Sequence, residues 1–240
     1  MRFSLVVPFY KFGDKERLEA DIEKKYSALK DFLLNDFELI YVSDGIVSNE
    51  EKEALGKKDK LLSKFPNLTI LENERNMGKG FSVRKGMKIA TGDFIGFMDF
   101  ESEVDTKYIK EALETLEKSD ADFLIPDRFN KKSVYKTHFS RKIMSIGYLI
   151  FNKILFGFSF PDSQAGFKIF RKESFKKILD KLTIDRFAFD IEMIALAKKE
   201  KLKYLQVPIR YVRKSSIKTT TNILTPIKMA IDSIRIRMKC

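Results

Sequence analysis

The sequence predicts an α/β protein with a mostly parallel central sheet flanked by helices. Short apolar runs alternate with longer amphipathic stretches through the first half of the chain. Several runs are continuously apolar, which is typical of strands that are covered on both faces. The stretches between them are about 10 to 20 residues long, the length of a crossover helix that joins two parallel strands.

The predicted elements follow in order along the chain. Strands are expected at 3–9, 37–43, 68–73, 93–99 and 122–127, with helices between them at about 14–33, 49–65, 79–90 and 105–119. In the second half we expect a basic aromatic helix at about 134–158, a helix near 190–200, a strand at 203–212 and an amphipathic helix over 223–239. In sheets of this kind ligands bind beyond the carboxyl ends of the strands.

Composition narrows the class of protein. Hydrophobic residues make up 44% of 240 residues, which is enough for the core of one large domain. The single cysteine excludes an internal disulfide and favours a reducing cytoplasm. The single histidine excludes a zinc site built from several histidines. No apolar stretch reaches the roughly 20 residues of a membrane-spanning helix.

The charge of the chain predicts an anionic partner. The formal net charge is +12, and the last forty residues carry ten Lys or Arg against Asp232 alone. A surplus placed in one sixth of the chain indicates a local function rather than general solubility.

The segment GDFIGFMDFESEVD, residues 92–105, ends in carboxylates at alternate positions, namely Asp99, Glu101, Glu103 and Asp105. In an extended chain these side chains share one side, and two carboxylates about 6.5 Å apart repel by about 2.5 kcal/mol at an effective dielectric constant of about 20. Water, neighbouring cationic side chains or a divalent cation must offset this repulsion. Carboxylate ligands without His or Cys suit Mg²⁺ or Mn²⁺. The alternative is a solvated strand end followed by a helix N-terminus at Asp105.

A glycine-rich segment, NERNMGKGFSVRKG at 73–86, places Gly78, Lys79 and Gly80 at the start of a predicted helix. The segment lacks the G-x-x-x-x-G-K-[ST] order of a P-loop, and Val83 stands where the dinucleotide fingerprint has its third glycine. The amide groups of a helix N-terminus still favour an anion. The alternative is a glycine turn that caps a surface helix.

Five segments together resemble the inverting family 2 glycosyltransferases of the GT-A fold: VVPFY, YVSDG, NMGKGFSVRKGMKIATGDFIGFMDFE, DSQAGFKIFRKE and RFAFDIEMIALA. The resemblance runs from Leu5 to about Lys218 and is strongest to the polyprenyl-phosphate (dolichyl-phosphate) sugar synthases, the glucosyl more than the mannosyl branch. It implies a GT-A, Rossmann-like domain over 1–218, followed by a basic amphipathic C-terminal segment over 219–240.

The resemblance implies transfer of a hexose from a UDP- or GDP-linked nucleotide sugar to a polyprenyl or dolichyl phosphate, with inversion. Asp99-Phe100-Glu101 stands in the place of the metal-binding D-x-D motif of the family, and Glu103 follows as a further ligand. Mg²⁺ or Mn²⁺ is therefore expected on Asp99, Glu101 and Glu103. The expected catalytic residues are Asp99, Glu101 and Asp162.

The other substrate contacts are also implied by the resemblance. Donor contacts are expected at Pro8, Tyr10, Asp44, Lys79, Asp99, Arg213 and Lys214. The acceptor phosphate is expected on Arg128, Arg141 and Ser145. A phosphate oxygen is already an anion near neutral pH, so the reaction requires positioning and charge neutralisation rather than a strong general base. The alternatives are a helix N-cap role for Asp162 and a solvated charge run at Arg213 and Lys214.

Two basic amphipathic segments, 134–158 and 223–239, predict peripheral contact with an anionic membrane on its cytoplasmic face, alone or with a membrane-protein partner. The alternative is a core helix and a polar tail.

Two other functions remain open. One is family 2 glycosyl transfer to a polysaccharide, glycolipid or protein. The other is a non-catalytic α/β module that binds anionic lipid or RNA through its basic tail. Nucleic acid is not the expected partner, because the Phe residues lie mostly in apolar periodic segments rather than among Lys and Arg.

Overall fold

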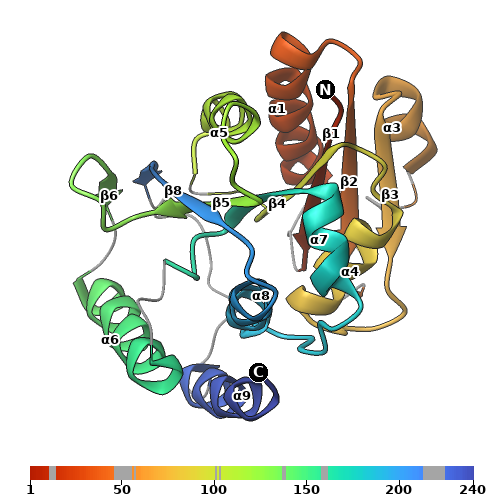
Figure 1. Cartoon of the computed structure of the whole chain (residues 1–240). Coiled ribbons are helices and arrows are strands. Elements are labelled where there is room, and N and C mark those ends of the chain that lie inside the picture. Colours follow the sequence, from red (N-terminus) through yellow and green to blue (C-terminus); the bar gives the residue numbers. More distant parts are fainter. Residues whose placement is uncertain are drawn as a thin grey trace.

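The computed structural model describes residues 1–10, 15–45, 56, 58–100, 102, 104–136, 139–157, 162–212 and 225–240, and it is a three-layer α/β structure (Figure 1). A seven-stranded sheet has the order β3-β2-β1-β4-β7-β5-β8, and a second sheet pairs β6 with β9. In the large sheet β7 alone runs antiparallel to its neighbours. The α/β fold class with a mostly parallel sheet is therefore confirmed.

The strands are β1 Phe3–Phe9, β2 Phe37–Ser43, β3 Leu68–Glu72, β4 Phe94–Met98, β5 Phe123–Asp127, β6 Val134–Lys136, β7 Phe167–Arg171, β8 Tyr204–Pro208 and β9 Arg210–Val212. The helices are α1 Lys15–Leu33, α3 Lys58–Lys64, α4 Lys79–Ile89, α5 Tyr108–Glu117, α6 Phe139–Phe156, α7 Lys172–Leu179, α8 Phe189–Lys199 and α9 Thr225–Lys239.

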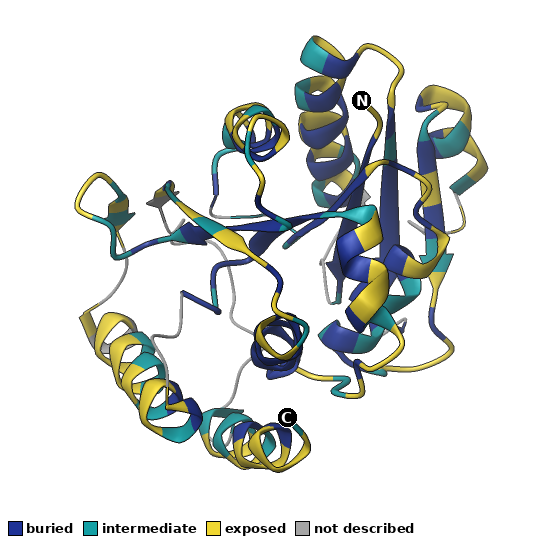
Figure 2. Cartoon of the chain, viewed as in Figure 1, coloured by how far each residue is buried: buried dark blue, intermediate teal, exposed yellow. Residues whose placement is uncertain are grey.

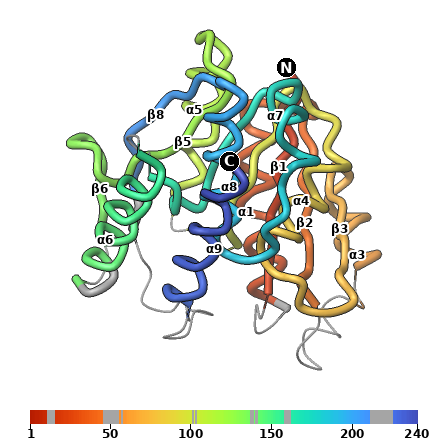
Figure 3. Tube along the Cα trace, turned by 60° about the horizontal axis from the view of Figure 1, so that its bottom comes forward, coloured from red at the N-terminus to blue at the C-terminus, as the bar shows by residue number. Residues whose placement is uncertain are grey.

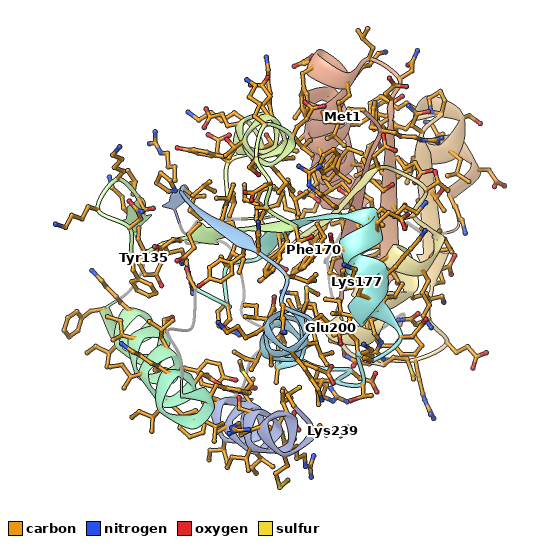
Figure 4. The ribbon with its side chains drawn as sticks, viewed as in Figure 1. Met1, Tyr135, Phe170, Lys177, Glu200 and Lys239 are labelled. Atoms are coloured by element: carbon orange, nitrogen blue, oxygen red, sulfur yellow. The ribbon has the colours of Figure 1, made fainter. Side chains whose placement is uncertain are left out.

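The sheet is covered on both faces, which explains its continuously apolar strands. Alternate residues of β1 serve the two sides: Leu5 belongs to the core under α1, α3 and α5, and Val6 to the core under α4, α7 and α8. Every residue of the central strands β1 and β4 is buried (Figure 2, dark blue). Phe170 on β7 lies near the centre of the molecule in the side-chain view (Figure 4).

Helix α8 is enclosed on all sides. Its residues from Phe189 to Ala197 are all buried, because α4, α7 and α9 pack on the helix and the Phe189 ring contacts that of Phe97 on β4. Helices α6 and α9 lie side by side in two views (Figures 1 and 3). The Tyr148 hydroxyl lies 2.9 Å from Ser233 Oγ, and Arg237 Nε donates to the Leu155 carbonyl at 3.1 Å. The basic segment at the end of the chain thus forms a helix that packs on α6 and α8.

The structure differs from the predicted elements at four places. The predicted helix at 134–158 begins at Phe139, because Val134–Lys136 pairs with Arg210–Val212 as a separate small sheet. The strand predicted at 203–212 is divided between the two sheets for the same reason. Strand β7 and helix α7 have no counterpart in the prediction. Strand β4 ends at Met98, so the four carboxylates of 99–105 do not continue one strand face.

Within the described part of the chain, no helix is both long and apolar enough to cross a membrane. The predicted helix at 49–65 is described only in part, with α3 as its C-terminal portion.

Candidate active site

The candidate site lies at the edge of the sheet where the parallel strands end. Strand β4 ends at Met98 and is followed directly by Asp99. Because β7 is antiparallel to β4, with Phe167 opposite Met98, the loop that precedes β7 reaches the same edge. The Asp99 amide donates a hydrogen bond to the Gly166 carbonyl at 2.9 Å. Topology thus brings residues 162–166 against the end of β4.

Four charged side chains form a line of alternating sign at this edge. Lys79 Nζ, at the first residue of α4, lies 2.7 Å from Asp99 Oδ1 and 3.8 Å from Asp190 Oδ2 at the start of α8. The other oxygen of Asp190 lies 2.5 Å from Lys168 Nζ on β7. We name Asp99, Lys79, Asp190 and Lys168 the charged row. Lys79 therefore neutralises part of the negative charge at Asp99. A neighbouring cationic side chain was one of the three expected ways to offset the repulsion among these carboxylates.

Lys168 anchors the inner end of the charged row. Its side chain is completely buried, and its ammonium group also donates to the Ser163 carbonyl at 2.7 Å and the Ala165 carbonyl at 2.9 Å. Burial lowers the pKa of Lys168, and the carboxylate of Asp190 only partly offsets that effect. These contacts fix both Asp190 and the backbone of the loop that carries Asp162.

Lys79 is the cation at the centre of the row. Burial lowers its pKa, but the nearby carboxylates of Asp99 and Asp190 outweigh that effect and raise the pKa above the ordinary lysine value. Its ammonium group also lies 5.6 Å from the Phe97 ring centroid and 5.4 Å from that of Phe189. Lys79 is therefore protonated throughout the neutral pH range.

Gly166 gives Asp99 the space that it occupies. A Cβ atom at this position would overlap Oδ2 of Asp99. The sequence did not reveal this role of Gly166, because its contact partner Asp99 lies far away in the chain. Only glycine allows the Asp99 carboxylate to lie against the β7 loop.

We expect the substitution Gly166→Ala to reduce the hexose transfer that the family resemblance implies by about a hundredfold, because the carboxylate of Asp99 must move. The same change should lower the free energy of unfolding by about 1–3 kcal/mol through overpacking. Transfer rates and chemical denaturation measure the two effects. Gly147→Ala is the matched control, since nothing lies within 4 Å of a Cβ at that helical position. Equal activity of the two variants would contradict the role of Gly166.

Asp44, expected on the donor side, follows β2 and is buried. Its carboxylate accepts hydrogen bonds from the Gly78 amide at 2.9 Å, the Met77 amide at 2.8 Å and Asn73 Nδ2 at 3.0 Å. The carboxylate of Asp44 is therefore an anion that already lies next to the N-terminus of α4. Asp44 positions the turn that leads into Lys79, and its direct contact with a nucleotide stays a prediction.

The glycines before and in α4 serve protein packing. A Cβ at Gly78 would overlap the Asp185 carbonyl, and one at Gly80 would overlap that of Ile184. The Phe81 amide donates to the Asp185 carbonyl at 3.0 Å. Protein acceptors take the amides of Met77, Gly78 and Phe81. An anion site on the amides of Lys79 and Gly80, the first two residues of α4, stays a prediction.

The loop that packs on these glycines is held by Glu192 of α8. This buried carboxylate accepts hydrogen bonds from the Thr183 amide at 2.9 Å, the Thr183 hydroxyl at 2.7 Å and the Ile184 amide at 2.8 Å. Helix α8 thus supports the site twice, through Asp190 and through Glu192.

Arg128 and Asp162, predicted for different tasks, form a buried ion pair. The guanidinium group donates to both carboxylate oxygens at 2.7 Å, and the Arg128 amide adds a third bond at 3.0 Å. The side chains are only 4% and 2% exposed. Asp162 is followed by a turn and then by β7, not by a helix, so the alternative of a helix N-cap is wrong. Arg128 Cζ also lies 5.2 Å from the ring centroid of Tyr135, the middle residue of β6 (Figure 4).

The structure describes some of the remaining predicted residues and not others. Pro8 is buried in β1, Tyr10 follows that strand and Ser145 is half-buried on α6. Arg141 belongs to α6, but its side chain is outside the described part. Glu101, Glu103, Arg213 and Lys214 lie outside the described residues. Their predicted roles stay predictions.

Asp99 offers the oxygen that a hard divalent cation would require. Its Oδ1 is shielded from solvent and has no regular hydrogen bond from any described residue, although Lys79 pairs with it as a cation. Oxygen ligands of this type fit Mg²⁺ or Mn²⁺. Among the residues that the structure describes, no three metal-binding side chains cluster, so further ligands must come from elsewhere.

Comparison with known proteins identifies the class of this fold and site. The family description "Glycosyl transferase family 2" matches residues 4–179. The dolichyl-phosphate beta-glucosyltransferase of Dictyostelium discoideum is 27% identical over 98% of this chain and 74% of its own length. The protein of the same name from Drosophila melanogaster is 29% identical over 92% of this chain and 70% of its length.

Solved structures share the fold. Staphylococcus aureus TarS 1-349, in complex with UDP-GlcNAc, aligns with a TM-score of 0.60 and 17% identity over 99% of this chain, which spans 66% of the TarS chain. The mannosyltransferase PcManGT from Pyrobaculum calidifontis, in complex with GDP-Man and Mn²⁺, aligns with a TM-score of 0.58 and 12% identity over 99% of this chain and 73% of its own.

The chain belongs to glycosyltransferase family 2 and has the GT-A fold. It is a glycosyltransferase whose curated relatives carry the name dolichyl-phosphate beta-glucosyltransferase at low identity.

Proposed function

We propose that this protein transfers a hexose, with inversion, from a nucleotide sugar to a polyprenyl or dolichyl phosphate. The observation that carries the proposal is the position of Asp99, which follows β4 at the ligand-binding edge and faces Lys79. The shared name of two curated relatives supports glucose as the sugar and dolichyl phosphate as the acceptor.

Asp99, with Glu101 and Glu103, would hold Mg²⁺ or Mn²⁺. When bound, the cation neutralises charge on the donor diphosphate as it leaves. The protein supplies the geometry: Gly166 and Lys79 position the Asp99 carboxylate, and the Arg128–Asp162 pair fixes the loop beside it. The acceptor phosphate is already ionised, so the reaction does not require a strong general base at this loop.

Calorimetric titration with UDP and with GDP, each with and without Mn²⁺, tests the donor side. We expect one of the two nucleotides to bind, and to bind more tightly with Mn²⁺. Binding of neither nucleotide to the folded protein would contradict the proposal and favour a non-catalytic module that binds anions.

The surface formed by α6 and α9 supports peripheral contact with an anionic membrane. It exposes large apolar side chains: Phe139, Ile143, Met144, Ile146, Ile150 and Ile154 on α6, and Ile227, Ile231, Ile234 and Met238 on α9. Exposed basic side chains accompany them: Lys142, Lys153, Lys228, Arg235, Arg237 and Lys239. In these two helices Asp232 is the single acidic residue. Figure 2 shows the exposed outer sides of both helices. Apolar residues beside Lys and Arg favour the surface of an anionic bilayer.

The double variant Ile154→Glu with Met238→Glu should bind anionic vesicles at least about tenfold more weakly, because burying one such apolar side chain contributes about 1.5–3 kcal/mol. Ile154 is 77% exposed and Met238 76% exposed, so the fold should tolerate both changes. Co-sedimentation with phosphatidylglycerol vesicles measures the effect. Leu34→Glu is the control, because Leu34 lies just after α1 and is 73% exposed. Unchanged binding of the double variant would refute this surface.

A further inference from the structure

Lys79 pairs with the carboxylate on which the proposed divalent cation would bind. Lys79 Nζ lies 2.7 Å from Asp99 Oδ1, the shielded carboxylate oxygen without a regular hydrogen bond from the described residues. A metal ion bound to that oxygen at about 2.1 Å would lie in the space and field of the ammonium group. Two cations cannot share this oxygen without strong repulsion.

Lys79 has a second carboxylate within reach. Asp190 Oδ2 lies 3.8 Å from its ammonium group, and Asp190 is itself held by the buried Lys168 at 2.5 Å. Asp190 cannot follow Lys79 without leaving Lys168 unpaired in the core. The side chain of Asp190 is 4% exposed, whereas that of Asp99 is 41% exposed. Asp190 is therefore the fixed, inner partner, and Asp99 is the more exposed side chain, although its Oδ1 is itself shielded.

The backbone around Lys79 is fixed, so only its side chain has freedom to move. Gly78 and Gly80 pack directly on the carbonyl groups of Asp185 and Ile184. Asp44 binds the amides of Met77 and Gly78 just before Lys79. A change of side-chain rotamer would carry the ammonium group from Asp99 toward Asp190.

We propose that Lys79 is an internal competitor of the divalent cation: it pairs with Asp99 until the cation binds, and it then moves to Asp190. The proposal rests on the proposed metal site at Asp99. Lys79 in this role regulates how tightly the cation binds before substrate arrives. The fixed Asp190–Lys168 pair provides the place to which Lys79 withdraws.

Titration of the full chain with Mn²⁺ alone, with free Mn²⁺ followed by electron paramagnetic resonance, tests the proposal without any turnover. We expect Lys79→Met to bind Mn²⁺ about tenfold more tightly than the unaltered protein, because the competing charge is gone. Lys79→Gln removes the same charge and should show the same gain. Lys88→Met is the matched control: it removes one charge from an exposed position of the same helix and should leave the affinity unchanged.

Asp99→Asn separates the two proposals. If Asp99→Asn abolishes Mn²⁺ binding but neither Lys79 variant binds more tightly, Lys79 does not compete, and the metal site of the proposed function stands. If Asp99→Asn binds Mn²⁺ as tightly as the unaltered protein, both the metal site and the role of Lys79 are overturned. Tighter binding by the Lys79 variants, lost again when Asp99→Asn is added, supports the competition.

Discussion

Asp99→Asn is expected to reduce hexose transfer by at least about a thousandfold while the protein stays folded. The substitution keeps the shape of the side chain and removes its charge, so the cation loses the ligand that follows β4. Loss of a metal ion that stabilises a leaving group costs several kcal/mol of transition-state stabilisation, and each 1.36 kcal/mol is a factor of ten. Initial rates with a labelled nucleotide sugar measure the effect, and a thermal melt checks the fold.

Asp105→Asn is the matched control for that substitution. Asp105 belongs to the same acidic segment, but its carboxylate accepts a hydrogen bond from the Lys107 amide at the start of α5 and is 42% exposed. We expect its transfer rate to stay within about twofold of the unaltered protein, as for ordinary surface substitutions. Equal losses from both substitutions would mean that the segment acts through its net charge, and normal turnover by Asp99→Asn would refute the metal site.

Arg128→Met is expected to cause the largest loss of stability, about 3–5 kcal/mol. The substitution leaves the carboxylate of Asp162 buried and unpaired, and a broken buried ion pair typically costs this amount. For a chain of this size the melting temperature should fall by about 10 °C. Chemical denaturation and calorimetry measure both quantities.

Two further variants test the cause of that loss. Adding Asp162→Asn to Arg128→Met should recover part of the stability, because no buried charge is then left without a partner. Arg235→Met breaks an exposed pair with Asp232, in which the Arg235 side chain is 64% exposed, and should cost less than about 1 kcal/mol. A loss from Arg128→Met no larger than that from Arg235→Met would show that the buried pair does not stabilise the loop.

The sequence predicted most of the fold because most of its elements are local. Apolar runs placed β1 and β2 at the observed residues and β3, β4 and β5 within a residue of their observed ends. The small sheet of β6 and β9 was missed, since its pairing joins residues about 75 positions apart and neither strand has a periodic pattern of its own. Strand β7 contains the fully buried Lys168, which interrupts the apolar pattern that indicates a strand.

The sequence predicted where the site lies and which types of residue it contains, but not which of its charged side chains pair with one another. The rule for strand ends placed Asp99 and Asp44 at the ligand-binding edge, and the glycine turn placed Lys79 nearby. The charged row depends on two helix starts and one antiparallel strand that meet only in three dimensions. The same holds for the Arg128–Asp162 pair, because the family resemblance assigned Arg128 to the acceptor phosphate and Asp162 to catalysis.

The most direct measurement incubates the protein with dolichyl phosphate, Mn²⁺ and either UDP-glucose or GDP-mannose, each labelled in the sugar. We predict that label from one of the two donors, UDP-glucose in the first instance, moves into the lipid as a β-linked dolichyl-phosphate hexose. Addition of a chelator should stop the transfer. If a folded sample binds the nucleotide with Mn²⁺ but moves no sugar to the lipid from either donor, the proposed acceptor is wrong.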